Sequence, residues 1–502
     1  MTELKNLQNG SDIRGVAISA EGFAANLTSV EAKRIALGIV EWLKRDKNMT
    51  TTPLKIAIGQ DSRLSGPEIK EGLAEAFLSE RVLVIDTNLS TTPAMFMATQ
   101  FSEIDADCGI MITASHLPFY YNGIKLFTKE GGAEHADIEA ILSYAPQIVE
   151  IDNMFGTRQE CDVISLYAAD LVEKIIRETG LEKPLADFHI VLDAGNGAGG
   201  FFAVKVLEVL GANTSGSQFL EPDGRFPNHI PNPDNKEAMK SIQEAVLANQ
   251  ADLGVIFDTD VDRAAVVDKS GQVINRNNLI AVLASIVLKS DPGSVIVTNS
   301  PTSSHLKEFI ESLGGKQVRY LCGYRNVINK AIELNKEGIN TPLAIETSGH
   351  AAFRENYFLD DGAYVIAKIL MLLPQLRQEN KELGDLIATL KQPKEAQEVR
   401  FKVLGEDYRH NGEAVIASLY DMVATHPNFE IDPDNDEGIR VNVTDNYGSG
   451  WFLLRMSLHE PLLVLQVEND EVGKNHLVFE TLQPFFERFD YLDTTTLDNI
   501  LS

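Results

Sequence analysis

The sequence predicts a chain of four domains: three related α/β domains with mixed sheets, followed by a C-terminal α+β domain with an antiparallel sheet. Three observations predict this fold class. The chain of 502 residues is too long for a single hydrophobic core. Apolar runs that end in polar loops and lead into helical patterns recur as far as residue 373. Beyond residue 392, strand-like runs follow one another without helices between them. We therefore expect domains over residues 1–155, 156–274, 275–391 and 392–502.

The composition is that of an ordinary soluble globular protein, with 44% hydrophobic and 23% charged residues. A net charge of −29 argues against nucleic acids and anionic membranes as partners, because both require a positive surface. The electrostatic field of this net negative charge also repels a phosphorylated substrate at long range. Local arginines, lysines and backbone N–H groups would have to overcome it, so basic residues inside tight motifs carry more weight than basic residues elsewhere.

Neither secretion nor membrane insertion is expected. The first ten residues lack the apolar core of a secretory signal. The apolar segments Ala281–Leu288 and Tyr364–Leu373 are shorter than the roughly twenty residues that span a bilayer. Cys108, Cys161 and Cys322 have spacings that form neither a disulfide framework nor a zinc site. We therefore expect a reducing, cytoplasmic location.

The first domain repeats a strand, a polar loop and a helix. The expected elements are helix Ser29–Leu43 with Ser29 as its cap and Glu31 in its first turn, strand Lys55–Gly59, a helix opened by Pro67, strand Val82–Ile85, helix Ala94–Phe101 and strand Cys108–Ile112. Arg14 lies in a Gly- and Asp-rich turn, and Arg63 lies in the loop after the first of these strands. For either arginine alone, a solvated surface turn is the favoured interpretation.

The stretch Thr113-Ala-Ser-His-Leu-Pro-Phe-Tyr-Tyr-Asn-Gly-Ile-Lys125 follows a buried strand, where α/β proteins place their chemistry. The Asn122-Gly123 dipeptide predicts a turn that brings Lys125 near Ser115. From this stretch alone, a surface hairpin with a few polar residues is an equally good interpretation.

The second domain opens with strand His189–Asp193, and Gly195, Gly197 and Gly200 then satisfy the G-x-G-x-x-G pattern before an expected helix, Phe201–Leu210. A dinucleotide-binding fold therefore competes as an interpretation. Its fingerprint also requires an acidic residue at the end of a second strand. The corresponding region, residues 219–233, is instead a loop rich in Pro, Gly and Asn.

Strand Ala251–Phe257 ends in three carboxylates at alternate positions, Asp258, Asp260 and Asp262. Such a group requires a counter-charge, which a hard oxygen-binding cation can supply. An EF-hand is excluded because its sixth and twelfth positions should be Gly and Glu, and the loop follows a strand. A solvated acidic turn is the alternative.

The third domain carries strand Ser294–Asn299, helix Leu306–Leu313, strand Leu343–Ile345 and helix Ala363–Leu373. Residues 392–398 read as a linker. Beyond them we expect helix Glu413–Ala424, strands Gly438–Val443, Trp451–Ser457 and Leu462–Glu468, and helix Lys474–Phe489.

Four of these loops together resemble the α-D-phosphohexomutases, the family of phosphoglucomutase and phosphomannomutase. The stretch from Thr113 to Lys125 resembles the family's phosphoserine loop, and the segment from Asp258 to Arg263 resembles its metal loop, Asp-Gly-Asp-Gly-Asp-Arg. The segment from Glu346 to His350 resembles the sugar-binding loop, and Arg455-Met-Ser-Leu-His-Glu-Pro461 resembles the phosphate-binding loop. The motifs occur in the family's order. The departures from the family pattern are Thr259, Val261, Ile345, Leu458 and His459.

The resemblance implies a phosphohexomutase that interconverts hexose 1-phosphate and hexose 6-phosphate, with glucose first and mannose next, through a phosphoserine and a hexose 1,6-bisphosphate. It implies one Mg²⁺ per chain, the bisphosphate as activator, sugar phosphates as the small-molecule partners, and a monomer or homodimer. The implied catalytic residues are Ser115, His116, Lys125, Arg14 and Arg263; the implied metal ligands are Ser115, Asp258, Asp260 and Asp262; the implied substrate-binding residues are Arg325, Glu346, Ser348, His350, Arg455, Ser457 and His459.

Two further functions are compatible with these motifs. The altered Leu458-His459 pair suggests a weaker hold on phosphate, which favours a hexose 1,6-bisphosphate synthase. The departures at Thr259, Val261 and Ile345 suggest a sugar-phosphate-binding relative without catalysis.

Overall fold

The computed structural model describes residues 3–20, 22–50, 52–405, 407–458 and 460–502. The chain forms two compact units. The first contains the residues up to Leu279 together with Ser348–Leu386, and the second contains Ile280–Thr347 together with Ile387–Ser502. Residues 275–391, predicted as one domain, contribute to both units.

The N-terminal part of the first unit is a mixed sheet in the order β1-β2-β6-β5-β3-β4-β8, with β7 paired to β6. Its strands β3, β4, β5 and β8 are parallel, and β6 runs antiparallel to β5 and β2. The strands are β1 Gln8–Asn9, β2 Asp12–Val16, β3 Lys55–Gln60, β4 Leu83–Leu89, β5 Cys108–Ile112, β6 Tyr121–Thr128, β7 Gly131–Gly132 and β8 Thr157–Glu160. The helical segments are η1 Leu4–Leu7, α1 Ser29–Arg45, α2 Gly66–Ser79, α3 Thr92–Met97 and α4 His135–Tyr144.

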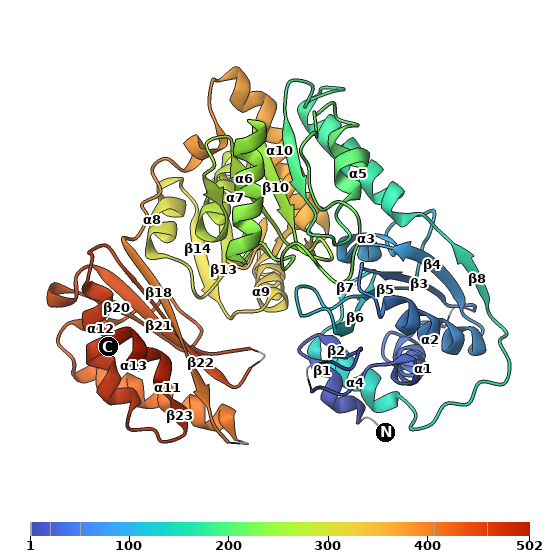
Figure 1. Ribbon diagram of the computed structural model, residues 1–502, viewed down its shortest axis with the longest axis horizontal. Coiled ribbons are helices and arrows are strands. Elements are labelled where there is room, and N and C mark those ends of the chain that lie inside the picture. The colour runs from blue at the N-terminus through green and yellow to red at the C-terminus, as the bar shows by residue number, and fades with distance from the viewer. Residues whose placement is uncertain (1–2, 21, 51, 406, 459) are drawn as a thin grey trace. The chain divides into compact units, whose positions relative to one another are not determined.

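Helices α1, α2 and α4 pack together on this sheet (Figure 1) and bury its apolar core. The cap of α1 is Thr28, one residue before the predicted Ser29. The Thr28 side chain accepts from the helix N-terminus, and Glu31 Oε2 accepts from the Thr28 N–H at 3.1 Å, which completes a capping box.

The predicted Asn122-Gly123 turn is wrong, because both residues lie within β6. The chain reverses earlier, over the serine loop, residues 113–120. Asn122 pairs with Gly15 of β2, and a Cβ on Gly123 would lie 2.5 Å from the Ile13 carbonyl oxygen. The glycine therefore permits close strand packing, and sheet pairing overrides the local turn preference.

The first unit also contains a sheet in the order β12-β11-β10-β9, in which β9 and β10 are parallel and β10 and β11 antiparallel. The strands are β9 Ile190–Asp193, β10 Leu253–Phe257, β11 Ala264–Asp268 and β12 Val273–Ile274; the helices are α5 Val163–Thr179, the π-helical η2 Ala203–Leu207 and α6 Lys236–Asn249. The helix predicted over residues 201–210 thus extends less far than expected. The second segment of the unit adds β16 Ala351–Phe353, η3 Arg354–Asn356, β17 Leu359–Asp360 and α10 Gly362–Gln378, which packs on α5.

The second unit combines parallel strands in the order β14-β13-β15 with a C-terminal antiparallel sheet in the order β19-β20-β21-β22-β18-β23. The strands are β13 Val295–Asn299, β14 Lys316–Tyr320, β15 Leu343–Ile345, β18 Glu395–Val403, β19 Phe429–Ile431, β20 Ile439–Val443, β21 Gly450–Met456, β22 Leu462–Asn469 and β23 Leu492–Asp493. The helical segments are α8 Ser304–Ser312, α9 Tyr324–Lys336, α11 Tyr408–Thr425, η5 Asp445–Tyr447, α12 Lys474–Phe486 and α13 Thr495–Leu501, while α7 Arg276–Ser290 and η4 Leu383–Ile387 cross the unit boundary.

The predicted fold class, three α/β domains with mixed sheets and a C-terminal antiparallel domain, is confirmed.

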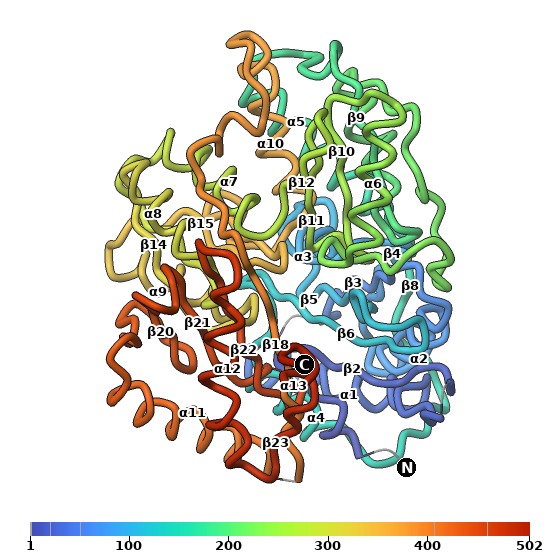
Figure 2. Tube along the Cα trace, turned by 60° about the vertical axis from the view of Figure 1, so that its left-hand side comes forward, coloured from blue at the N-terminus to red at the C-terminus, as the bar shows by residue number. Residues whose placement is uncertain are grey.

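The linker predicted over residues 392–398 is wrong in part, because β18 begins at Glu395 and pairs along its length with β22. Val399, Phe401 and Val403 alternate toward a buried core. Helices α11, α12 and α13 contact β18, and the course of this strand and of these helices can be followed in Figure 2. Because the first residues of β18 are polar, the apolar alternation that begins at Val399 was not recognised in the sequence.

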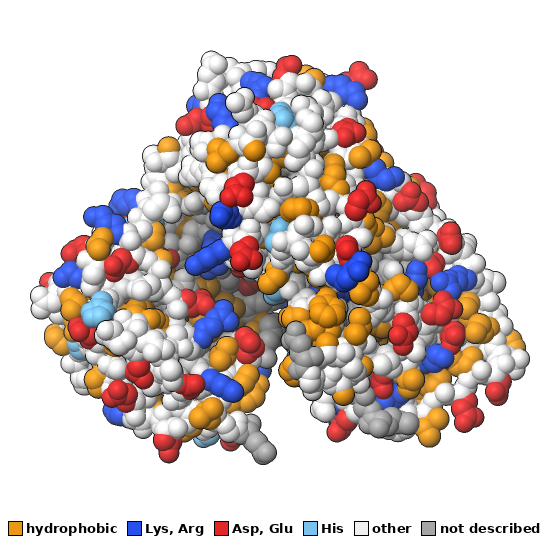
Figure 3. All heavy atoms as spheres, in the orientation of Figure 1, with side chains coloured by type: hydrophobic (Ala, Val, Ile, Leu, Met, Phe, Trp, Pro, Cys, Tyr) orange, Lys and Arg blue, Asp and Glu red, His pale blue; other side chains and the backbone are white. Residues whose placement is uncertain are grey.

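Acidic and basic side chains are interspersed on the face drawn in Figure 3. Within the described ranges, no helix has both the length and the apolar character that crossing a membrane requires.

Candidate active site

The serine loop, residues 113–120 between β5 and β6, holds Ser115 almost fully buried with a left-handed φ of 51°. The Ser115 Oγ donates to Asp258 Oδ2 at 3.2 Å and accepts from Arg263 Nη2 at 3.1 Å. The hydroxyl therefore lies between a carboxylate and a guanidinium group. This arrangement suits an oxygen that gains and loses a charged group.

The acidic loop, Asp258–Arg263 between β10 and β11, brings three buried carboxylates together, with oxygens within 4.8 Å of one another. Burial raises the pKa of Asp258 well above its usual value, and the carboxylates of Asp262 and Asp260 raise it further. Within the part of the chain that the structure describes, Asp260 Oδ1 and Asp262 Oδ1 accept no hydrogen bond. Buried carboxylate oxygens with free lone pairs are the ligands that a hard divalent cation takes, so the loop fits Mg²⁺.

The two residues that replace glycine in this loop behave differently. Val261 has a φ of 66°, the left-handed conformation that glycine adopts freely and a β-branched residue adopts only under strain. Thr259 has no such torsion. The backbone of the loop therefore keeps a glycine-like conformation at position 261 in spite of the substitution.

Two side chains place positive charge beside the carboxylates. Lys125 of β6 donates from Nζ to Asp260 Oδ2 at 3.1 Å and also to Asp262, and it is buried. Arg263 Nε lies 3.1 Å from Asp258 Oδ2. Lys125 and Arg263 thus place two positive charges beside the three carboxyl groups, and a bound divalent cation would add further positive charge there.

His116 and Arg14 lie beside the same group. Arg263 Nη2 donates to His116 Nδ1 at 2.6 Å. The positive charge of Arg263, together with burial and with Arg14, lowers the pKa of His116 to about 2. The ring is therefore neutral with Nδ1 as acceptor. Arg14 Nη2 donates to Asp12 Oδ2 at 3.0 Å within β2.

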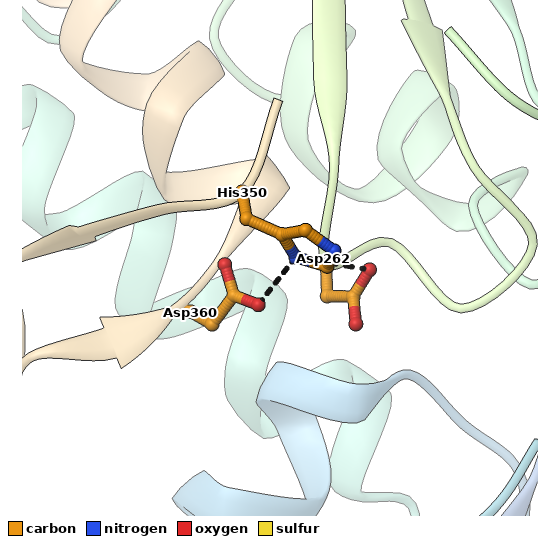
Figure 4. A group of neighbouring side chains, drawn as sticks. All are labelled: Asp262, His350 and Asp360. Carbon is orange, nitrogen blue, oxygen red and sulfur yellow. Dashed lines mark hydrogen bonds and ion pairs between the residues drawn. The ribbon is translucent and has the colours of Figure 1, made fainter. Parts of the chain in front are cut away.

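His350 lies against the acidic loop (Figure 4). Its Nδ1 is 2.6 Å from Asp360 Oδ2 and 3.9 Å from Asp262 Oδ1. Burial would lower the pKa of His350, but the Asp360 and Asp262 carboxylates outweigh it and raise this pKa to about 9. A backbone bridge joins His350 to Arg263. His350, expected to bind substrate, is thus a cation at the acidic loop; Ser348, two residues earlier, is partly exposed in the same unit.

Sequence reasoning missed two contributors to this cluster. Asp360 pairs with His350, and Thr92 at the start of α3 donates its hydroxyl to Asp260 Oδ2 and its N–H to the Asp260 carbonyl oxygen at 2.9 Å. The Asp360-Asp-Gly362 run before a helix was a usable signal for the first. A threonine in a polar loop before a helix gives no comparable signal for the second.

The glycine-rich loop over residues 195–200 packs on the acidic loop. A Cβ built on Gly197 would lie 2.6 Å from the Thr259 carbonyl oxygen, and one on Gly200 would lie 2.1 Å from that of Leu220. The protein's own backbone therefore occupies the space where a dinucleotide pyrophosphate would approach. The Gly197 contact, at the second glycine of the pattern, argues against the dinucleotide interpretation.

A separate cluster lies in the second unit. Glu346 Oε1 accepts from the Gly323 N–H at 2.7 Å. Glu437, which sequence reasoning missed, accepts from the Cys322 N–H at 3.3 Å and from the Ser300 hydroxyl, and its carboxylate is 3.9 Å from Arg455 Nε. Carboxylates thus bind consecutive backbone amides at the start of α9, and Arg455 lies beside one of them.

The remaining residues expected to bind substrate lie around this cluster. Arg325 Nη2 donates to Asn329 Oδ1 at 3.2 Å, and the Ser457 N–H donates to the Leu462 carbonyl oxygen at 2.8 Å. The Leu458 side chain is partly exposed and contacts the Gly323 turn. His459 lies outside the described residues.

Models of the phosphoglucomutase/phosphomannomutase family match three segments of the chain: alpha/beta/alpha domain I over residues 5–150, domain II over 166–271 and domain III over 275–393. The chain is similar to the phosphomannomutase/phosphoglucomutase of Pseudomonas syringae pv. tomato, with 30% identity over 432 residues, 85% of this chain and 86% of the relative. It is 32% identical over 424 residues to the phosphoglucomutase of Neisseria gonorrhoeae, covering 83% and 85%. A solved phosphoglucomutase/phosphomannomutase family protein from Burkholderia thailandensis superposes with a TM-score of 0.76 at 26% identity, covering 96% of both chains.

Proposed function

The chain belongs to the phosphoglucomutase/phosphomannomutase family of the α-D-phosphohexomutase superfamily, and we propose that it interconverts hexose 1-phosphate and hexose 6-phosphate through a phosphoryl group on Ser115. Membership makes the protein an isomerase of the phosphohexomutase type. The names of its relatives support glucose and mannose phosphates as substrates, with glucose first.

One observation carries the proposal: the Ser115 hydroxyl lies within 3.2 Å of both an acidic-loop carboxylate and the Arg263 guanidinium group. In the first half-reaction, the bond between Ser115 Oγ and phosphorus breaks, and the free hydroxyl of the sugar phosphate forms the new oxygen–phosphorus bond. This transfer gives hexose 1,6-bisphosphate and leaves a free serine hydroxyl. Phosphoryl transfer of this kind depends mainly on positioning and on electrostatic stabilisation.

The charges around Ser115 support this chemistry. Arg263 would stabilise negative charge on the departing Ser115 oxygen, and Lys125 would add positive charge from β6. Mg²⁺ held by Asp258, Asp260 and Asp262 would supply further neutralisation of the transferring group when bound. We assign proton transfer to Lys125 and His116. A phosphoryl group on Ser115 would offset the field of Arg263 that keeps the pKa of His116 low.

The second-unit cluster suits recognition of the sugar phosphate. We propose that Glu346 and Ser348 hold sugar hydroxyls, as the family's sugar-binding loop implies, and that Arg455, Ser457 and Arg325 bind the phosphate that is not reacting. The bisphosphate must then turn over and return its other phosphoryl group to Ser115. Such a step requires motion within the enzyme, and this motion or product release commonly limits turnover.

Turnover on glucose 1-phosphate, mannose 1-phosphate and glucosamine 1-phosphate tests the proposal, with Mg²⁺ present and hexose 1,6-bisphosphate added as activator. We expect mutase turnover, one phosphoryl group on Ser115 by mass spectrometry, and loss of both in Ser115→Ala. Ser143→Ala, which removes an exposed hydroxyl on α4, is the matched control and should retain full activity. Full activity in Ser115→Ala would refute the proposal.

A bisphosphate synthase is the second candidate, because the apolar Leu458, one of the departures from the family's phosphate-binding loop, contacts the Gly323 turn. A weaker hold on phosphate would favour escape of the intermediate. Free bisphosphate that accumulates when a phosphoryl donor is supplied would favour this function over the mutase. We also infer a cytoplasmic location, which the free thiols of Cys108, Cys161 and Cys322 support.

A further inference from the structure

We propose that Arg63 is a positioning residue that fixes the backbone of the serine loop and thereby aims the Ser115 hydroxyl. The inference rests on the proposed function of Ser115. It concerns a residue outside the reacting group, since the Arg63 side chain is directed at backbone rather than at the acidic loop or at a substrate.

The Arg63 guanidinium group is fully buried, and its two terminal nitrogens donate hydrogen bonds to backbone carbonyl oxygens. Nη1 donates to the carbonyl oxygens of Pro118 at 2.8 Å and Tyr121 at 3.0 Å. Nη2 donates to the Leu117 carbonyl oxygen at 2.6 Å and to that of Ser115 itself. One side chain thus binds carbonyl groups along the length of the loop, and a planar fork with several donors is required to do so.

A second set of contacts reaches the N–H side of Ser115. Arg63 Nε lies 3.3 Å from Asp61 Oδ2, and the Thr113 hydroxyl donates to the same oxygen at 2.6 Å. The Thr113 Oγ1 in turn accepts from the Ser115 N–H at 2.9 Å. Both peptide groups of Ser115 are therefore held by one buried network that starts at Arg63.

The conformation of Ser115 explains why such a network is needed. A φ of 51° is unfavourable for a residue with a side chain, and it persists only where the surroundings determine it. Without the network, Ser115 would relax toward negative φ, and its Oγ would move away from Asp258 and Arg263. Even a small displacement of a reacting atom lowers the rate of the chemical step strongly.

Another loop, which carries Gly224 and Phe226, packs against the Arg63 loop. The Phe226 ring lies 5.3 Å from the Arg63 guanidinium carbon, and a Cβ on Gly224 would lie 2.3 Å from the Ser62 carbonyl oxygen. The turn that carries both residues therefore packs directly on the arginine loop. Burying a guanidinium group is expensive unless its donors are satisfied, so an arginine at this place indicates that the backbone contacts are its role.

Arg63→Lys tests the inference, because lysine keeps the charge but cannot reach the same set of carbonyl groups. The matched control is Arg34→Lys. Arg34 is also buried, and its Nε donates to the Pro146 carbonyl oxygen at 2.9 Å, on a different loop. Three quantities are measured for each protein: kcat and KM, the hydrogen-exchange protection of residues 113–121, and the midpoint of urea unfolding.

For Arg63→Lys we expect kcat to fall by about 100-fold with KM changed by less than about threefold, as a misplaced nucleophile predicts. Residues 113–121 should lose protection. Arg34→Lys should lower the unfolding midpoint comparably but leave kcat and this protection unchanged. Hydrogen exchange is measured without turnover. If the proposed function is wrong, the wild-type protein will therefore be inactive, but Arg63→Lys will still lower the exchange protection of residues 113–121.

Thr113→Val supplies a second variant if Arg63→Lys does not fold, since it removes only the hydroxyl that accepts from the Ser115 N–H. We expect about a tenfold loss of kcat with KM nearly unchanged. The unfolding midpoint should also fall, because the buried Ser115 N–H and Asp61 Oδ2 both lose a hydrogen-bond partner. Wild-type kcat in either folded variant would overturn the inference. Equal losses of kcat and of protection in Arg34→Lys would overturn it as well.

Discussion

A methyl group added at position 197 tests whether the glycine-rich loop exists to receive the acidic loop. Gly197 has no left-handed torsion, so alanine fits its backbone, and the effect of Gly197→Ala comes from contact alone. The new Cβ would lie 2.6 Å from the Thr259 carbonyl oxygen, so the acidic loop must retreat by about 0.8 Å to reach ordinary contact near 3.4 Å. Overpacking of this kind costs about 1–3 kcal/mol. The lower entropy of the unfolded alanine chain offsets about 0.4–1 kcal/mol of it.

We therefore expect Gly197→Ala to lower the free energy of unfolding by roughly 1–2 kcal/mol, measured by urea denaturation. Displacement of the acidic loop should also lower kcat, on the order of tenfold to a hundredfold, and raise the Mg²⁺ concentration that activity requires. Gly66→Ala is the control, because its new Cβ would meet only the flexible Gln60 side chain at 3.2 Å. Wild-type stability and Mg²⁺ dependence in Gly197→Ala would refute this reasoning.

Three further perturbations probe the metal site, a buried ion pair and the second unit. Mg²⁺ at about 100 times its dissociation constant should raise the free energy of unfolding by about 2.7 kcal/mol, and Asp260→Asn should remove most of that increase. Burial would lower the pKa of His229, but the Asp193 carboxylate at 3.0 Å outweighs it and raises this pKa. The charged pair therefore adds stability that is complete below about pH 6.5 and is lost as the pH rises through the folded-state pKa, so the stability difference between wild type and His229→Gln should shrink with rising pH. Arg440→Leu should cost about 3–5 kcal/mol by urea denaturation, because the buried Arg440, 3.6 Å from the Trp451 ring centroid, belongs to an ion-paired network.

The metal-site and Arg440 perturbations each have a control variant nearer the surface. Asp252→Asn should keep the Mg²⁺ effect, since Asp252 pairs with Arg377 away from the acidic loop. Arg400→Leu on β18 should cost no more than about 1 kcal/mol, because its ion pairs are exposed. An Mg²⁺ effect that survives in Asp260→Asn, a pH-independent difference for His229→Gln, or a small cost for Arg440→Leu would each contradict the corresponding argument.

Features that depend on neighbouring residues were predictable from the sequence. The β5 strand, bounded at Cys108 and Ile112 as predicted, follows from an uninterrupted apolar run. The acidic loop could be recognised because its three carboxylates lie within five residues, where their repulsion indicates a cation. Strand β15 was also predicted at its observed bounds, Leu343–Ile345, because a short apolar run that ends at polar residues is a local signal.

Other features were decided by the tertiary structure. The Lys125 partner Asp262 lies 137 residues away in the chain, and Ser115 meets Arg263 across 148 residues. No pattern within one segment encodes such pairs, because they form only when separate sheets bring their loops together. The Asn122-Gly123 dipeptide shows that a local signal can also mislead. Its residues favour a turn, but pairing of β6 with β2 places them in a strand.

The sequence by itself therefore determined the fold class, the family and the loops that carry chemistry, because each is written in local pattern and spacing. The tertiary structure alone decided which polar groups contact one another. Arg63 binds the Ser115 carbonyl group, His350 pairs with Asp360, and Glu437 lies beside Arg455. The physical reason is that burial and electrostatics depend on distance in space. Residues far apart in sequence acquire that proximity only through the packing of the folded chain.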